Sequence, residues 1–177
     1  MESSRTPQPR EDNPVTPDNL IIRIDDRLIH GQVLIGWGSR LRLAKIVVGN
    51  DHIAANEWER QLLLMSAPPE ANAEVRTLAE TLNFINGWTG GKDHAMVLLN
   101  GLVDLLWMAE HGLAPQAINV GGIHFKEGRR EVLPYLFLSA DDIEAARRLL
   151  AMGFILECLD VPTGNRRPLE TLLEALP

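Results

Sequence analysis

Apolar positions along this chain alternate between short hydrophobic runs and longer stretches at helical spacing. This alternation is typical of βα units built around a mainly parallel sheet. It predicts an α/β fold, with an open, mainly parallel sheet of six to seven strands and helices on both faces. The runs predicted to be strands are residues 20–24, 44–48, 74–78, 95–99, 117–120 and 154–158, with 135–138 as a seventh.

Helix starts are marked by residues that cap a first turn. Asn56 with Glu59, and Ser139 with Asp142, have the spacing at which a side chain caps the third helical residue. Pro168 stands where a first-turn proline belongs, ahead of a leucine-rich stretch. Residues 121–134 contain paired glycines and a charged turn, and predict an irregular hairpin. The apolar residues that share one face of the first predicted helix are Trp58, Leu62 and Met65.

Composition divides the chain into a tail and one domain. Residues 1–19 carry four prolines and charges of both signs, which predicts a disordered tail before a single domain at 20–177. The net charge of -7 argues against nucleic-acid binding. One cysteine forms no internal disulfide, and the sequence contains neither a signal peptide nor a stretch long enough to span a bilayer. These features indicate an intracellular protein.

The segment RIDDRLIHGQV, residues 23–33, carries the candidate chemistry. It leads from the first predicted strand into a helix start, where free backbone N–H groups and the helix dipole favour an anion. Ligands of doubly wound sheets bind outside the carboxyl ends of the strands, which is where this loop lies. His30 adds a nucleophile, because neutral imidazole can attack phosphorus and hold a phosphoryl group covalently. A phosphohistidine carrier is the leading hypothesis.

The other polar residues of the segment suit a phosphate group. Arg27 can hold two phosphate oxygens through its planar guanidinium. Asp25 would be repelled by a phosphate, so we expect it to orient Arg27 instead. Arg23 either adds positive charge or ties down a loop carboxylate, and its sequence position leaves both roles open. Gly31 permits close backbone approach, and Gln32 contributes a backbone N–H of the first helical turn.

This segment, followed by Trp37, closely resembles the active-site loop of the enzyme IIB component of the mannose/fructose/sorbose family of the phosphoenolpyruvate-dependent sugar phosphotransferase system. Further blocks in the same order are IVVGNDHIA at 46–54, SAPP at 66–69, INVGG at 118–122 with the following HFKEGR, and LSADDIEAARRLLAMGF at 138–154. The resemblance covers nearly all of the chain from residue 20 onward.

The resemblance implies a function and a set of partners. His30 would receive a phosphoryl group on Nδ1 from a phosphorylated IIA protein or domain. It would then pass the group to a sugar held by the membrane components IIC and IID, with Arg27, Asp25 and Arg23 shaping the phosphate site. A cytoplasmic protein associated peripherally with the membrane permease is implied, as is the absence of any metal or organic cofactor.

The loop after the fourth strand departs from the family pattern. Family members commonly place a Thr or Ser with a Pro there, whereas this chain reads LLNGLVD at 98–104. Asn100 is therefore a candidate to supply an amide N–H in place of the hydroxyl. The departure keeps open an alternative function, a regulatory sensor of phosphorylation state that docks IIA without feeding a sugar permease.

Other signals in the sequence are weaker. GWTGGKD at 87–93 lacks the first glycine and the Ser or Thr of a P-loop, and Gly36 and Gly38 lack the third glycine of a dinucleotide fingerprint, which disfavours nucleotide binding. The spacing of the remaining histidines builds no metal site, so we interpret His52, His94, His111 and His124 as structural. His124, which follows Gly121 and Gly122, is the one to examine for proximity to the phosphate.

Overall fold

The computed structural model describes residues 19–38, 41 and 43–176. The strands are β1 (Leu20–Ile24), β2 (Leu43–Gly49), β3 (Ala73–Arg76), β4 (His94–Leu99), β5 (Ala117–Val120), β6 (Arg130–Leu133), β7 (Leu136–Leu138), β8 (Ile155–Cys158) and β9 (Arg167–Pro168). The helices are α2 (Asp51–Ala55), α3 (Glu57–Leu64), α4 (Leu78–Gly87), α5 (Leu102–Glu110), α6 (Ala140–Ala151) and α7 (Leu169–Glu174), with a π-helical segment η1 (Val33–Gly38) and a 3-10 turn η2 (Pro69–Ala71).

The main sheet has the strand order β3-β2-β4-β1-β5-β8-β9. Its strands pair in parallel except β9, which runs antiparallel to β8. Ile24, the last residue of β1, is level with Leu99 of β4 and Val120 of β5. The predicted α/β class and open, mainly parallel sheet are therefore confirmed, and the loop after β1 emerges between two neighbouring strands.

Two sequence-based strand assignments need correction. Residues 135–138 do not join the main sheet, because β7 pairs antiparallel with β6 in a separate hairpin. The seventh strand of the main sheet is instead β9, whose two residues are too few to show a periodic pattern. Leu78 is not the end of a strand but the start of α4, since the Thr77 side chain accepts a hydrogen bond from the backbone N–H of Glu80 and caps the helix.

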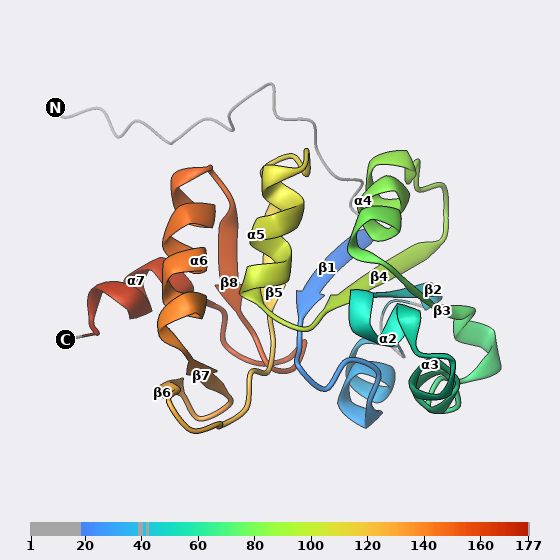
Figure 1. The fold of residues 1–177 in the computed structure, drawn as a ribbon, viewed down its shortest axis with the longest axis horizontal. Coiled ribbons are helices and arrows are strands. Elements are labelled where there is room, and N and C mark those ends of the chain that lie inside the picture. The colour runs from blue at the N-terminus through green and yellow to red at the C-terminus, as the bar shows by residue number, and fades with distance from the viewer. Residues whose placement is uncertain (1–18, 39–40, 42, 177) are drawn as a thin grey trace, which may run out of the picture.

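Side chains that alternate along the central strands pack into two layers of core. Ile22, Val97 and Val120 contribute to the layer beneath α4, α5, α6 and α7. Ile46 and Leu98 contribute to the opposite layer, which contains η1 residues and is joined by partly buried side chains of α2 and α3. Figure 1 shows α4, α5 and α6 in front of the sheet, while the loop after β1, α2, α3 and the β6–β7 hairpin gather at its lower edge. Helical segments therefore cover both faces, as predicted.

The predicted helix starts at Asn56 and Ser139 both carry side-chain caps. Asn56 accepts from the backbone N–H of Glu59, and Ser139 forms a reciprocal capping box with Asp142. Pro168 lies one position earlier than predicted, at the N-cap of α7. Residues 121–129 form the connection from β5 to the β6–β7 hairpin, close to the predicted irregular hairpin.

The predicted tail at 1–19 lies outside the described residues, apart from Asn19. The Asn19 side chain donates to the carbonyl groups of Gly91 and Asp93 and accepts from the Trp88 indole. These contacts hold the 88–93 connection as a loop at the amino end of β4, the opposite edge from His30. Among the described residues, no helix is long and apolar enough to cross a membrane.

Candidate active site

Backbone hydrogen bonds fix the loop after β1 to both neighbouring strands. The Asp25 N–H donates to the Leu99 carbonyl at 3.0 Å, and the Asp26 N–H donates to the Gly122 carbonyl at 2.8 Å. The chain after β1 continues to one face of the sheet, while α5 and α6 cover the other face. The loop therefore emerges at a topological switch point, where doubly wound sheets bind ligands.

The His30 ring is mostly buried, with 16% of its side chain exposed. Nδ1 lies 2.9 Å from the Leu28 carbonyl oxygen, and Nε2 lies 3.8 Å from an Asp25 carboxylate oxygen. Nε2 is buried without a hydrogen-bond partner. A ring that donates Nδ1–H to Leu28 keeps its lone pair on Nε2. Attack through Nδ1, as the resemblance implies, requires the proton on Nε2 and release of Nδ1 from the Leu28 carbonyl.

Leu28 places that carbonyl through an unusual backbone conformation. Its φ is 57°, in the left-handed region that non-glycine residues seldom adopt, and its side chain is buried. Its N–H donates to the Asp25 carbonyl at 2.9 Å and closes a tight turn. Burial of the neighbouring Ile29 anchors the loop further. Strained backbone of this kind concentrates where a functional group must be held in one place.

Asp25 is the centre of the loop's charge network. It is fully buried, and its carboxylate accepts from Arg23 Nη2 at 2.9 Å and from Arg27 Nε at 3.2 Å. It also accepts from the Arg27 backbone N–H at 3.3 Å and from Nη2 at 3.4 Å. A buried carboxylate shared by two guanidinium groups fixes the Arg27 side chain in direction, which is the geometry that an orienting role requires.

Arg23 lies beneath this carboxylate and is itself fully buried. Besides Asp25, its guanidinium donates to the Asn119 side chain and to the Leu159 and Asp160 carbonyls. Burial lowers the pKa of Arg23, and Asp25 opposes that shift. Of the two roles left open by the sequence, these contacts favour tying down the carboxylate over direct contact with a phosphate.

Gly121 and Trp37 are the neighbours that accommodate the buried guanidinium of Arg23. A Cβ at Gly121 would clash with the Arg23 guanidinium, so any larger residue there would have to displace this buried group. The guanidinium carbon lies 5.5 Å from the centre of the Trp37 ring, within the range of a cation–π contact. Trp37, on η1, thus supports the site by packing against Arg23.

Arg27 is the exposed cation of the loop, with 35% of its side chain accessible. Its Nη2 donates to the Gln32 side-chain oxygen at 3.1 Å, so Gln32 contacts Arg27 through its side chain as well as leading into η1. Space beside Gly31 is open. Asn100 is exposed one residue past Leu99, the pairing partner of Ile24. The structure thus groups Arg27, Gln32 and His30 around Asp25 and places Asn100 at the same edge.

A second charge cluster, built on Asp26, was not predicted from the sequence. Asp26 accepts from His124 Nδ1 at 2.6 Å and from the His124 backbone N–H at 2.9 Å. Arg129 Nη1 lies 3.4 Å from the same carboxylate and donates to the His124 carbonyl at 2.7 Å. Burial raises the pKa of Asp26, but the His124 hydrogen bonds and the Arg129 charge outweigh it, and the pKa lies below its usual value.

The sequence contained a partial signal for this cluster. Successive side chains of an extended segment point to opposite sides, so the adjacent Asp25 and Asp26 could not both serve one group of cations. Which basic residue Asp26 meets depends on a contact with His124, 98 positions further along the chain. Local spacing carries no information about such a contact.

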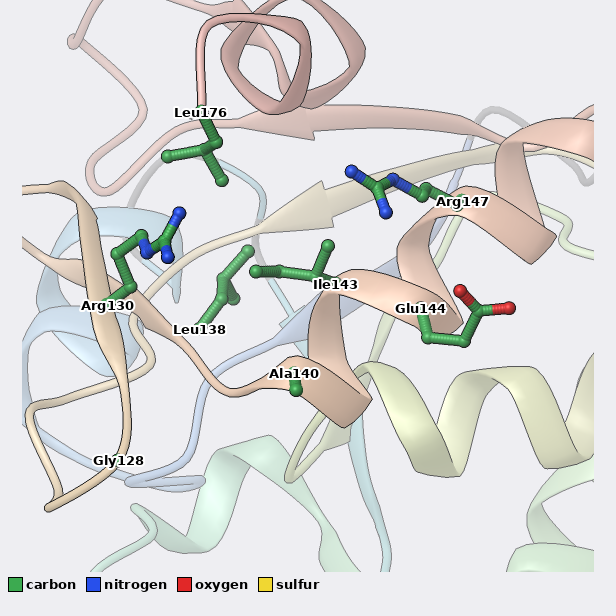
Figure 2. A pocket seen from close by; sticks show the side chains of 8 residues that line it. All are labelled: Gly128, Arg130, Leu138, Ala140, Ile143, Glu144, Arg147 and Leu176. Carbon is green, nitrogen blue, oxygen red and sulfur yellow. The ribbon is translucent and has the colours of Figure 1, made fainter.

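A cavity of about 340 Å³ lies apart from this loop. Figure 2 shows the side chains of Leu138, Ile143 and Leu176 converging between the guanidinium groups of Arg130 and Arg147. None of the loop residues 25–32 lines it. Within the described ranges, no group of His, Cys, Asp and Glu side chains is arranged to hold a metal ion.

Comparisons with known proteins give this arrangement a family. Residues 19–176 match the family model described as "PTS system sorbose subfamily IIB component". The mannose-specific EIIAB component of Escherichia coli is 31% identical over 172 residues, which cover 95% of this chain and 53% of that protein. The fructose-specific EIIB component of Bacillus subtilis is 30% identical over 144 residues, covering 81% of this chain and 88% of that one. This chain spans about half the length of its mannose-specific relative.

Solved structures of related proteins lead to the same family. The IIBSor domain of the sorbose permease from Klebsiella pneumoniae has a TM-score of 0.78 at 27% identity and covers 90% of this chain and 98% of its own. A chain described as a phosphoenolpyruvate-dependent phosphotransferase system reaches a TM-score of 0.81 at 28% identity, over 90% of this chain and 99% of its own. The fold and these matches thus define an open α/β phosphotransferase-system domain. This chain belongs to the sorbose subfamily of IIB components, which confirms the resemblance drawn from its motifs.

Proposed function

We propose that this protein is the IIB phosphocarrier of a sugar phosphotransferase system, with His30 as the phosphoryl acceptor. The observation that supports this role most strongly is the Arg23–Asp25–Arg27 network beside a mostly buried imidazole. The network carries one net positive charge and directs one guanidinium toward solvent. Phosphoryl transfer requires mainly such positioning and neutralisation of charge.

The proposed reaction has two balanced steps. The lone pair of one His30 ring nitrogen attacks phosphorus on the phosphohistidine of IIA, a new N–P bond forms, and the N–P bond of IIA breaks with its electrons returning to the IIA imidazole. In the second step a sugar hydroxyl attacks the same phosphorus and releases its proton to water, while the electrons of the His30 N–P bond return to the ring, which leaves as neutral imidazole. Arg27 stabilises the equatorial oxygens in both steps.

Exposed apolar side chains support a docking surface at this edge. On η1, Ile35 is 75% exposed, and on the connection after β5, Phe125 is 69% exposed. Three more lie on α3 and at its C-cap: Trp58, Leu62 and the C-cap residue Met65. Apolar groups of this size mark sites of protein association when they gather on one side of a molecule. We propose that IIA, and then the IIC and IID components at the cytoplasmic side of the membrane, bind here.

Intact-protein mass spectrometry at neutral to mildly alkaline pH tests the proposal. The protein is incubated with phosphoenolpyruvate, the two general phosphotransferase proteins and a cognate IIA. We expect the wild type to gain the mass of one phosphoryl group and His30→Ala to gain none. His52→Ala, which removes an exposed histidine from neighbouring α2, is the matched control and should gain one group. Uptake of phosphate by a folded His30→Ala variant would defeat the site assignment.

The loop at 98–104, which departs from the family pattern, favours a second candidate function, a sensor of phosphorylation state. The same assay system tests it. A phosphorylation-state sensor would accept the phosphoryl group on His30 but would not release it to a sugar. Membrane vesicles that contain IIC and IID distinguish the two, because a carrier loses its phosphoryl group when sugar is added and a sensor retains it.

A further inference from the structure

His124 lies beside Arg27 at the mouth of the candidate site. Gly122 separates them, and an ideal Cβ built on that glycine would lie 3.0 Å from His124 Cε1 and 3.3 Å from Arg27 Nη2. The same point is 3.5 Å from an Asp25 carboxylate oxygen. The imidazole edge and the guanidinium therefore border one small volume. A phosphoryl group with one oxygen bonded to each would bridge that separation.

The His124 ring is held in one orientation. Asp26 accepts from its Nδ1 at 2.6 Å, which leaves Nε2 as the other ring nitrogen, and 45% of the side chain is exposed. Within the described part of the chain, Nε2 has no protein hydrogen-bond partner. A protonated imidazole donates from both ring nitrogens, so with Nδ1–H bonded to Asp26 the Nε2–H of that form is free to bind an oxygen.

The charges of the two clusters complement a phosphoryl group. Arg23, Asp25 and Arg27 together carry one net positive charge. With His124 protonated, the cluster of Asp26, His124 and Arg129 carries another. A phosphoryl group near neutral pH carries about two negative charges. Arg27 alone leaves that charge partly uncompensated, and the second cluster would complete the match.

We propose that His124 is a second phosphate-contacting imidazole, which donates its Nε2–H to an oxygen of the phosphoryl group carried on His30. Asp26 and Arg129 act as positioning residues that fix its ring. This inference rests on the proposed carrier function and extends it by one named contact. His124 forms no covalent bond in the reaction.

The test is single-turnover transfer from phosphorylated IIA, followed by rapid quench. We expect His124→Gln to be roughly 10-fold slower, because a neutral amide N–H replaces a charged donor. His124→Lys keeps a charged donor and should recover part of the rate. His111→Gln, at the C-terminal cap of α5, is the control and should match the wild type.

Two results would overturn the inference while leaving the carrier function intact. One is a His124→Gln variant with the wild-type rate. The other is a slow His124→Gln variant whose rate is not improved in His124→Lys, which would indicate a structural role only. Thermal unfolding of each variant checks the fold. Asp26→Ala provides a second variant, because it removes the acceptor that fixes the His124 ring without removing the ring, and it should also slow transfer.

A measurement that does not need IIA tests the phosphate contact of His124 separately. It applies even if the wild type accepts no phosphoryl group and the carrier proposal fails. Inorganic phosphate is titrated into the protein while NMR follows the ring nitrogens of His124. Shifts of these signals in the wild type that are lost in Arg27→Ala would support the phosphate contact. Absence of a shift at His124 would overturn it.

Discussion

Asp25 and Asp26 are neighbours in the sequence but serve different groups of cations. Asp25 binds Arg23 and Arg27, while Asp26 binds His124 and Arg129. Both carboxylates are shielded from water, so neither can turn to the other group without leaving a charge unpaired at substantial cost. Two adjacent residues therefore organise most of the charge around His30.

At the scale of a single residue, we predict that Arg27→Lys impairs transfer but leaves the fold intact. Lysine keeps the charge beside Asp25 but loses the planar fork that binds two oxygens. We expect transfer from IIA to His30 to slow roughly 10- to 100-fold, in line with the loss of one charge-assisted hydrogen bond. Rapid-quench kinetics measure the rate, and an unchanged thermal midpoint would separate this effect from unfolding. Transfer at the wild-type rate would mean that only the charge of Arg27 matters.

Helix α3 shows how an amphipathic pattern can serve something other than the core. Its apolar face was predicted from Trp58, Leu62 and Met65, yet these side chains are 73%, 56% and 82% exposed. Leu63 on the same helix packs instead with the cluster that contains Leu28 and Ile29. The helix is thus attached to the layer beneath the active loop while its larger apolar side chains remain in solvent.

At the scale of the element, we predict that Trp58→Ser and Met65→Ser each weaken the binding of IIA. The IIA concentration for half-maximal transfer should rise about 10-fold or more, as for a residue central to an interface, while the maximal rate changes little. Ile155→Ser is the matched control, because Ile155 is 58% exposed at the start of β8, on the opposite edge of the sheet. An equal effect of all three substitutions would contradict a docking role for α3.

Across the whole molecule, two carboxyl groups make opposite contributions to the pH dependence of folding. The pKa of Asp26 is lowered in the folded protein, so its contribution is present above the unfolded pKa and is lost as pH falls through the folded one. Burial, followed by the nearby charges of Asp51 and Asp142, raises the pKa of Asp104. Folding is favoured below the unfolded pKa of Asp104, and that contribution disappears as pH rises through the folded pKa.

We therefore predict that Asp104→Asn raises the free energy of unfolding at pH 7, because it removes a charge that burial and two like charges disfavour. The gain should shrink as the solution is acidified through the folded pKa of Asp104. Asp26→Asn should have the opposite sign at pH 7, and its deficit should shrink below about pH 4, the range of an unperturbed aspartate. Urea unfolding at several pH values measures both, and a stability gain that does not vary with pH would exclude the charge explanation.

The sequence by itself determined the α/β class, most strands of the main sheet, the helix caps at Asn56 and Ser139, the family and the loop that carries His30, because each rests on local spacing or on contiguous motifs. Local spacing also placed Arg27 beside Asp25, two residues away. The tertiary structure alone decided that Arg23 is buried under Asp25, that α3 exposes its apolar face and that His124 meets Asp26. Each of those outcomes depends on residues tens of positions apart being brought to one edge of the sheet, and no local pattern encodes such a contact.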